Sequence, residues 1–392
     1  MRSEKLFKKA IKIFPGGVNS PVRFYQPYPR FIKYGKGQRI WDVDGNAYTD
    51  YVLAYGPLIL GHGNKTIAKA IAKRSEEGTM FGAPTEEELK LGEIIARNAN
   101  LDMLRFVNSG GEATYHALRL SRFVTKRKKI LKVKGGYHGT HDFNYPGEFV
   151  KEIDFNDSQA LKDELSSREY AAFIIEPIMG NVGVILPEQG YLQDVREYTE
   201  KFGTLYISDE VITGFRTKFG IYSDKYEPDL VTLGKIIGGG APLAAYGGRE
   251  EFMKNVRPAG EFRQAGTYAG NPLSVSAGLA AMKILQKKDY GKLNYLSNVA
   301  AGILEKSGVT VNMATGMLSM HFSDDKIRNY SQIDTRLYND IWAKLFPYSL
   351  SSGIFIAPSP EETMFISFSH TLKDITRDME LISRRVEEIW KK

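Results

Sequence analysis

Hydrophobic and polar positions follow two patterns along this chain. From about residue 62 to residue 273, short apolar runs alternate with stretches in which apolar residues recur at helical spacing. The clearest runs predict buried strands at 104–107, 130–133, 171–175, 204–208 and 230–233. Strands that alternate with helices are typical of crossover units that build a mostly parallel sheet. In such a sheet ligands bind beyond the carboxyl ends of the strands, so we expect the chemistry in the polar and glycine-rich loops there.

The flanking segments have a different pattern. Residues 1–14 predict an amphipathic surface helix, which Pro15-Gly16-Gly17 ends, and alternation around Asp44-Gly45 predicts a tight hairpin. A long helix is predicted over 273–286, followed by mixed helices and strands. The predicted domains are an N-terminal segment over 1–61 that packs with the small domain, a large α/β domain over 62–273 and a small α+β domain over 274–392.

Composition narrows the class of protein. The chain has 392 residues, of which 42% are hydrophobic and 12% aromatic, which excludes a disordered or fibrous protein. Its net charge of +7 is spread over a long chain, so we expect a small anionic ligand and no nucleic acid. The lack of cysteine excludes disulfides, thiolate metal sites and thiol nucleophiles. Because neither a signal peptide nor a run of about 18 apolar residues stands out, we expect no membrane partner and a cytoplasmic location.

Two glycine-bearing loops can hold a flat, phosphorylated ligand. The first loop, Asn108-Ser109-Gly110-Gly111, follows a predicted strand and begins a predicted helix. The backbone amides and the positive end of that helix suit a phosphate. An ordinary strand-to-helix turn without a ligand has the same pattern and is the alternative. After the next strand, Tyr137 can stack on a heterocycle, although a buried core tyrosine is an equal alternative. His138 and His141 have no third ligand in the sequence, so we expect no metal site.

Three further side chains follow predicted strands. A carboxylate held against a pyridine nitrogen keeps that nitrogen protonated and makes the ring an electron sink. Asp209 is the candidate for this carboxylate. Helix capping or ion pairing is the alternative for Asp209 and for Glu176. Lys235 stands between apolar residues, where burial favours the neutral amine that attacks an aldehyde, although a solvated loop lysine fits as well. Taken as a set, a phosphate cradle, a stacking ring, an acid and an amine describe pyridoxal 5'-phosphate.

With these motifs, the chain resembles the class III, fold type I aminotransferases and, within that family, most closely the glutamate-1-semialdehyde 2,1-aminomutases. The matching segments run nearly end to end and are 14–23, Gly56-Pro57, Gly61-His62, Asn108-Ser109-Gly110, Tyr137-His138-Gly139, Glu176-Pro177, Asp209-Glu210-Val211, Thr213-Gly214-Phe215-Arg216, 233–240, Gly266-Thr267, Gly270-Asn271-Pro272 and Ser369-His370-Thr371. The resemblance implies a central, mostly parallel sheet flanked by helices, a smaller α+β domain, and a homodimer with shared active sites.

The resemblance also implies roles for individual residues. Lys235 would form the Schiff base with the cofactor and later move a proton, Asp209 would pair with the pyridine nitrogen, and Val211 and Tyr137 would cover the two faces of the ring. The other implied cofactor contacts are Ser109, the phosphate-binding Gly110 and Gly111, His138, Asn181 near the phenolic oxygen, and Thr267 from a second subunit. The implied substrate contacts are Ser20, Arg23, Tyr55, Arg263 and Glu362, and an arginine suits a substrate carboxylate.

The chain also departs from the aminomutases. Gly111 stands where the family often has threonine, Tyr55 where the aminomutases have tryptophan, and Arg263 where they have tyrosine. Between Gly139 and Glu176 the chain is shorter by a loop. In the aminomutases this region closes over the active site, and a lid that retains an intermediate lets one enzyme both remove and replace an amino group.

From these observations we expect an enzyme dependent on pyridoxal phosphate, with pyridoxamine phosphate as its alternate form, that moves an amino group on a small carboxylate-bearing substrate. The leading reaction is the conversion of glutamate-1-semialdehyde to 5-aminolevulinate. Because the lid region is short and the pocket is altered, an intermolecular transaminase for another amino acid, amine or amino sugar is the alternative. A non-catalytic binding protein of the same fold is a third reading, against which the presence of Lys235 and Asp209 argues.

Overall fold

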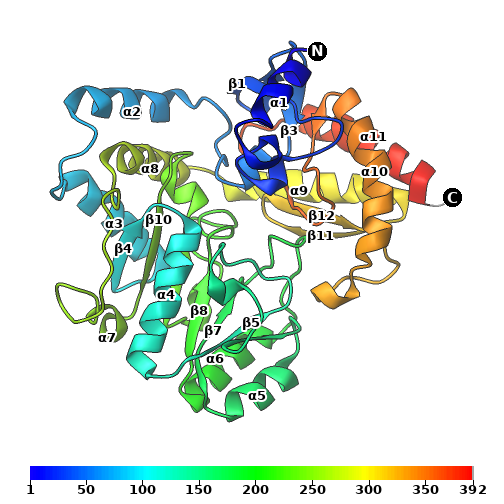
Figure 1. Cartoon of the computed structure of the whole chain (residues 1–392). Coiled ribbons are helices and arrows are strands. Elements are labelled where there is room, and N and C mark those ends of the chain that lie inside the picture. Colours follow the sequence, from blue (N-terminus) through cyan, green and yellow to red (C-terminus); the bar gives the residue numbers. More distant parts are fainter. Residues whose placement is uncertain (391–392) are drawn as a thin grey trace. The chain divides into compact units, whose positions relative to one another are not determined.

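The computed structural model describes residues 1–390, which form two compact units (Figure 1). Of the described residues, the first unit contains 1–64, 291–327 and 333–390. The second unit contains residues 65–290 and 328–332.

The second unit is built on a seven-stranded sheet in the order β4-β10-β9-β8-β7-β5-β6. Its strands are β4 (Met103–Val107), β5 (Lys129–Val133), β6 (Val150–Ile153), β7 (Tyr170–Ile175), β8 (Leu205–Asp209), β9 (Leu230–Leu233) and β10 (Ala244–Gly248). Only β10 runs antiparallel to its two neighbours, and the other pairs are parallel. The mostly parallel sheet and all five predicted strands are therefore confirmed.

Helices cover the sheet of the second unit. They are α2 (Lys65–Glu77), α3 (Glu86–Ala99), α4 (Gly110–Thr125), α5 (Ser158–Ser166), α6 (Tyr191–Phe202), α7 (Glu250–Met253) and α8 (Pro272–Leu285). Helix α4, cyan in Figure 1, packs on β7, β9 and β10, where its apolar face meets a core of wholly buried strand residues. β7 is buried at every position, as expected of a central parallel strand. The carboxyl ends of β5, β7, β8 and β9 thus bring their loops to one edge.

The boundary between the units differs from the predicted domain boundary at residue 273. Helix α8 belongs to the second unit because it packs on α2, on α3 and on the 3-10 helix η6 (Lys235–Gly238) that follows β9. Asn271 begins α8 by accepting hydrogen bonds from Leu273 N at 3.0 Å and Ser274 N at 3.3 Å. The predicted helix over 273–286 is therefore present, and it supports the loop of Lys235.

The first unit holds two smaller sheets, β1-β2-β3-β13 and β11-β12-β14. Its elements are α1 (Arg2–Ala10), η1 (Pro15–Gly17), η2 (Pro21–Arg23), β1 (Ile32–Lys36), β2 (Arg39–Asp42), β3 (Ala47–Asp50), η3 (Leu53–Tyr55), α9 (Tyr290–Leu304), β11 (Thr310–Ala314), β12 (Met317–His321), α10 (Thr335–Ser351), β13 (Ile354–Phe355), β14 (Met364–Phe365) and α11 (Leu372–Trp390). The predicted hairpin joins β2 to β3, with Gly45 at a φ of 94°. The parallel pairing of β3 with β13 joins the N-terminal segment to the C-terminal part of the chain.

No helix within residues 1–390 combines the length and the apolar character that crossing a bilayer requires. Within the same residues, no group of three or more histidine and carboxylate side chains is placed to hold a metal ion.

Substituting Gly278 of α8 tests the packing beneath the Lys235 loop. A Cβ atom at Gly278 would lie 2.2 Å from the backbone oxygen of Ile237 in η6, so the two backbones must separate. We expect Gly278→Ala to lower the free energy of unfolding by about 1–3 kcal/mol. The matched control is Gly302→Ala in α9, where a Cβ meets no atom within 4 Å and should stabilise the helix by about 0.5–1 kcal/mol. Thermal unfolding followed by circular dichroism measures both changes, and equal melting temperatures would contradict this account of the packing.

Candidate active site

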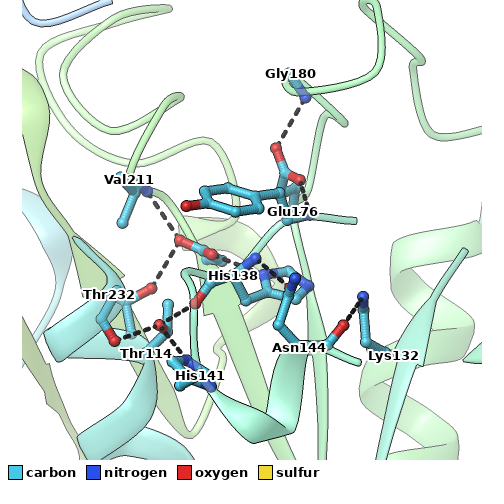
Figure 2. Close-up of polar contacts among 12 residues, drawn as sticks. Thr114, Lys132, His138, His141, Asn144, Glu176, Gly180, Val211 and Thr232 are labelled. Carbon is cyan, nitrogen blue, oxygen red and sulfur yellow. Dashed lines mark hydrogen bonds and ion pairs between the residues drawn. The ribbon is translucent and has the colours of Figure 1, made fainter. Parts of the chain in front are cut away.

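A buried carboxylate, Asp209, stands at the carboxyl end of β8. In the parallel pairing of β8 with β9 it lies opposite Thr232, whose Oγ1 donates to Asp209 Oδ1 at 2.8 Å. The amide of Val211 donates to the same oxygen at 3.2 Å, and His138 Nδ1 lies 2.7 Å from Asp209 Oδ2 (Figure 2). A carboxylate offers about four acceptor positions. Three donors orient Asp209, and one position is left for a further donor such as a ring N–H.

The backbone of His138 is held by hydrogen bonds at both its amide and its carbonyl. The His138 amide donates to Asn144 Oδ1 at 2.9 Å, and Thr114 Oγ1 donates to the His138 carbonyl (Figure 2). Lys132 Nζ, buried between Asn144 O at 2.9 Å and Glu152 Oε1 at 3.1 Å, fixes the backbone of Asn144. Burial lowers the pKa of Lys132, and the charge of Glu152 opposes that shift. These contacts fix the backbone of His138, and its ring contacts Asp209 through Nδ1.

Glu176, at the end of β7, ties two loops together. Its Oε1 accepts from Tyr137 N at 3.1 Å and its Oε2 accepts from Gly180 N at 2.9 Å (Figure 2). Burial raises the pKa of Glu176, and the negative charge of Asp209 adds to this rise. The contacts of Glu176 are therefore those of an anchor, not of a helix cap or an ion pair. It holds the backbone of two loops, one at Tyr137 and the other at Gly180, next to Asn181.

Three glycines allow the backbone to approach Val211 and the Tyr137 loop. A Cβ at Gly110 would lie 2.8 Å from Val211 Cγ1, and a Cβ at Gly234 would lie 3.2 Å from the same atom. A Cβ at Gly111 would lie 3.2 Å from the Cα of Gly139. The start of α4, the side chain of Val211 and the residue before Lys235 are thus in contact.

The first turn of α4 has two roles. Ser109 Oγ accepts from Glu112 N at 3.2 Å, so its side chain caps the helix. The amides of Gly110 and Gly111 belong to the first turn, whose N–H groups have no partner within a helix. Together with the positive end of the helix dipole, these amides are suited to a phosphate.

Lys235 begins η6, and only Gly234 separates it from β9, the strand that pairs with β8. Its side chain is half-buried, and its φ of 48° lies in the left-handed region, which costs a residue with a Cβ about 1–3 kcal/mol. Strained backbone of this kind gathers at functional sites. Because Thr232 of the same strand donates to Asp209, the strand pairing brings the backbone that leads into Lys235 to the same edge of the sheet.

These side chains fit pyridoxal phosphate. The ring of Tyr137 is 47% exposed although its backbone is anchored, and its hydroxyl lies 3.2 Å from Thr140 Oγ1. An anchored, exposed ring can cover one face of a heterocycle, and Val211 offers an apolar surface for the other. The remaining acceptor position of Asp209 and the amine of Lys235 complete the set of groups that the cofactor requires.

Other predicted residues lie outside this hydrogen-bonded network. Asn181 is half-buried and follows Gly180, whereas Arg263 and Thr267 are exposed on the loop that precedes α8. His141 Nε2 lies 3.1 Å from Thr114 Oγ1, whereas the ring of His138 contacts Asp209, so the two imidazole rings have different partners.

The first unit contains four of the predicted substrate residues, and two of them, Arg23 and Tyr55, line the same cavity. Burial raises the pKa of Tyr55, the charge of Glu362 raises it further and that of Arg23 lowers it. Ser20 immediately precedes η2 and is half-buried, whereas Arg23 is exposed. This group combines a cation, an anion and a phenol, which suits an amino acid-like substrate.

Sequence reasoning missed two supporting residues, Thr232 and Asn144. Thr232 contacts Asp209 through the register of two parallel strands, and no local sequence signal fixes that register. Asn144 lies six residues beyond His138 in the irregular loop around η4 (Asp142–Asn144), where a hydrogen bond to His138 N has no sequence signature.

Known proteins resemble this chain over nearly its whole length. The model of the family described as "Aminotransferase class-III" matches residues 22–145 and 141–301. The glutamate-1-semialdehyde 2,1-aminomutase of Thermoplasma volcanium is 42% identical over 420 aligned positions, covering 99% of this chain and 100% of that protein. The protein of the same name from Archaeoglobus fulgidus is 42% identical, covering 97% and 98%.

Among solved structures, an omega-transaminase from Sphaerobacter thermophilus superposes with a TM-score of 0.93 at 28% identity, covering 100% of this chain and 98% of that one. A glutamate-1-semialdehyde aminomutase from Pseudomonas aeruginosa superposes with a TM-score of 0.89 at 24% identity, covering 99% and 93%, and this likeness concerns the fold. The family match and the full-length relatives agree with the motifs of the sequence, and the chain belongs to the class III aminotransferases.

Proposed function

We propose that this enzyme uses pyridoxal phosphate to convert glutamate-1-semialdehyde to 5-aminolevulinate. The geometry that supports the cofactor is the pairing of β8 with β9, which places a three-times hydrogen-bonded Asp209 beside the strand that leads into Lys235. The full-length likeness to aminomutases at 42% identity supports the specific reaction.

Pyridoxal phosphate, when bound, supplies an electron sink for reactions at the carbon that bears the amino group. In our proposal Asp209 accepts a hydrogen bond from the protonated ring nitrogen, and His138 keeps that carboxylate in place. Lys235 contributes the amine that the cofactor aldehyde requires, and its Nζ then holds and moves the proton at the substrate carbon. The strained backbone of Lys235 restricts where Nζ can lie.

The remaining contacts orient the two reactants. The amides of Gly110 and Gly111 bind the phosphate at the start of α4, with Ser109 capping that helix. Val211 and Tyr137 cover opposite faces of the ring, and Asn181 lies near its phenolic oxygen. For the substrate we propose Arg23 as the partner of the carboxylate, accompanied by Ser20, Tyr55, Arg263 and Glu362.

We also propose that the enzyme is a homodimer in which Thr267 of a second copy contacts the cofactor phosphate. The second unit carries exposed aromatic side chains that a partner surface can cover, namely Phe81, Tyr115, Tyr145 and Tyr268. Thr267 lies next to Tyr268, and its own exposure leaves it available to a second copy.

An intermolecular transaminase is the second candidate. An alignment of 420 positions exceeds this chain of 392 residues, so the Thermoplasma relative has residues that this chain lacks. A shorter lid retains an intermediate less well and favours release of the keto product. Tyr55 and Arg263 also change the pocket relative to the aminomutases, and an omega-transaminase has the higher TM-score of the two structures compared above.

The decisive experiment supplies the purified holoenzyme with glutamate-1-semialdehyde and no second substrate. An aminomutase forms 5-aminolevulinate over many turnovers, because the amino group it removes is the one it returns. A transaminase stops after one half-reaction and resumes only when an amino acceptor or donor is added. Product measured in large excess over enzyme therefore supports the aminomutase, and a single-turnover limit contradicts it.

Replacing Lys235 tests the amine. We expect Lys235→Ala to lose the visible absorbance of the cofactor bound as a Schiff base and at least about a hundredfold in turnover, because both the covalent attachment and the proton carrier are removed. The exposed Lys128, which follows α4, provides the matched control Lys128→Ala, in which absorbance and turnover should stay unchanged. A Lys235→Ala protein with the absorbance and activity of the parent enzyme would end the assignment.

Replacing Glu176 tests its anchoring of the two loops. Glu176→Gln cannot accept from both Tyr137 N and Gly180 N, because the amide group has only one acceptor oxygen. Misplacement of Tyr137 or Asn181 should lower kcat by between about ten- and a hundredfold and shift the cofactor absorbance. The control is Glu169→Gln, which changes a surface ion pair with Lys129.

Stability should respond to Glu176→Gln in a different way from activity. Because burial raises the pKa of folded Glu176 above its unfolded value, the folded protein loses stability as pH rises from the unfolded pKa to the folded one. The variant has no such loss, so we expect its melting temperature to fall less than that of the parent enzyme over this range. A variant that is destabilised equally at every pH while keeping its absorbance and kcat would show that Glu176 only supports the fold.

A further inference from the structure

The turn η3 (Leu53–Tyr55) has an unusual backbone. Its three residues have φ values of 46°, 56° and 64°, although none is glycine. Side chains with a Cβ rarely adopt the left-handed region, and three such residues in succession are rarer still. A backbone of this kind persists only where its surroundings hold it in place.

Asp50 and His62 hold the turn. Asp50 Oδ1 accepts from Val52 N at 2.8 Å and from Leu53 N at 3.0 Å, which fixes the entry to the turn. Asp50 Oδ2 lies 2.7 Å from His62 Nε2, and the side chain of Leu53 is fully buried. The chain therefore maintains the strained turn with a buried carboxylate, a histidine and a core side chain.

The Tyr55 hydroxyl contacts the segment formed by residues 15–24. Tyr55 OH donates to Val22 O, the carbonyl directly before Arg23. The other hydrogen bonds of residues 15–24 stay within 14–24, for example Arg23 N to Ser20 O at 3.1 Å and Phe24 N to Pro21 O at 3.0 Å. Of the hydrogen bonds described for residues 1–390, the one from Tyr55 is therefore the link between this segment and the rest of the unit.

Packing beneath the segment is incomplete. A cavity of about 430 Å³ lies between it and the neighbouring strands, lined by apolar groups that include Phe14, Val18, Val22, Ile40 and Phe355. Close-packed side chains fix a backbone, and a cavity of this size removes that support. Packing on α1 holds the two ends of the segment, because a Cβ at Gly17 would lie 2.6 Å from Phe7 Cε2 and the rings of Phe7 and Phe24 are 6.3 Å apart. Between these ends, beside the cavity, the hydroxyl of Tyr55 holds the backbone at Val22.

We propose that Tyr55 is a positioning residue that fixes Val22 and, through the backbone, presents Arg23 to a carboxylate-bearing substrate. The proposal rests on the proposed function in one respect, the pairing of Arg23 with the substrate carboxylate. An arginine that is ordered before binding loses less freedom when it binds, so the hydroxyl lowers KM. Because the bond lies on the carboxylate-binding side and not at the reacting atoms, its loss leaves kcat nearly unchanged.

The variant Tyr55→Phe removes the hydroxyl and keeps the ring. We expect the amides of Arg23 and Phe24 to exchange with deuterium at least about fivefold faster than in the parent holoenzyme, because the segment opens more often. For glutamate-1-semialdehyde we expect KM to rise by about three- to tenfold, kcat to stay within about twofold and the cofactor absorbance to stay the same.

The matched control is Tyr48→Phe in β3. This change also removes one tyrosine hydrogen bond from the first unit, the one to Asp42 Oδ2 at 2.9 Å, and it touches no part of residues 15–24. The control should leave both the exchange of Arg23 and Phe24 and the KM unchanged. It separates a local effect of Tyr55 from a general loosening of the unit.

Two results would overturn the proposal. Unchanged exchange of residues 20–24 in Tyr55→Phe, or equal acceleration in Tyr48→Phe, would show that the hydroxyl does not fix the segment. Faster exchange with an unchanged KM would show that the fixed segment does not serve the substrate. If the parent enzyme turns over no carboxylate-bearing substrate, the proposed function fails by that measurement, and the exchange data still decide whether Tyr55 fixes the segment.

Discussion

The hydrogen bond between His138 and Asp209 is the interaction on which the candidate site depends. It forms between two side chains that are nearly inaccessible to solvent, so neither can exchange its partner for water. The register of β8 and β9 places Thr232 against Asp209. The loop that Asn144 anchors places His138 against the same carboxylate. The same loop carries Tyr137, so the position of the stacking ring and the orientation of the carboxylate are set together.

Local patterns predicted much of this molecule. The five strands, the helix α8 and the hairpin at Asp44-Gly45 follow from apolar runs, periodicity and turn chemistry, which depend on neighbours in sequence. Strand β10 was missed because Ala-Ala-Tyr-Gly-Gly has few of the branched residues that mark a strand, and its place between β4 and β9 comes from tertiary pairing. Their place after predicted strands and their chemistry indicated Asp209, Tyr137 and Lys235, and the family resemblance implied the same roles, but neither showed which contacts hold them.

The supporting contacts could not be predicted because they join residues that are distant in sequence. Glu176 was recognised as an acid at a strand end, yet its partners are two backbone amides in different loops. The left-handed turn at Leu53–Tyr55 contains no glycine or asparagine that would predict it, and the carboxylate of Asp50 holds its first residues from outside the turn. Such features depend on the assembled fold, in which contacts from many residues offset the cost of a strained backbone or a buried carboxylate.

The contact between Gly111 and Gly139 has a consequence for how this sequence can change. Gly139 has a φ of 100°, and a methyl group there would meet the Cα of Gly111 at 2.4 Å, so position 139 is closed to every larger amino acid. Position 111 is less severely restricted, because a Cβ there would lie 3.2 Å from the Cα of Gly139 and asks for only a small backbone shift. The loop of Tyr137 can therefore tolerate a larger residue at position 111 if it moves slightly, but it cannot tolerate one at position 139.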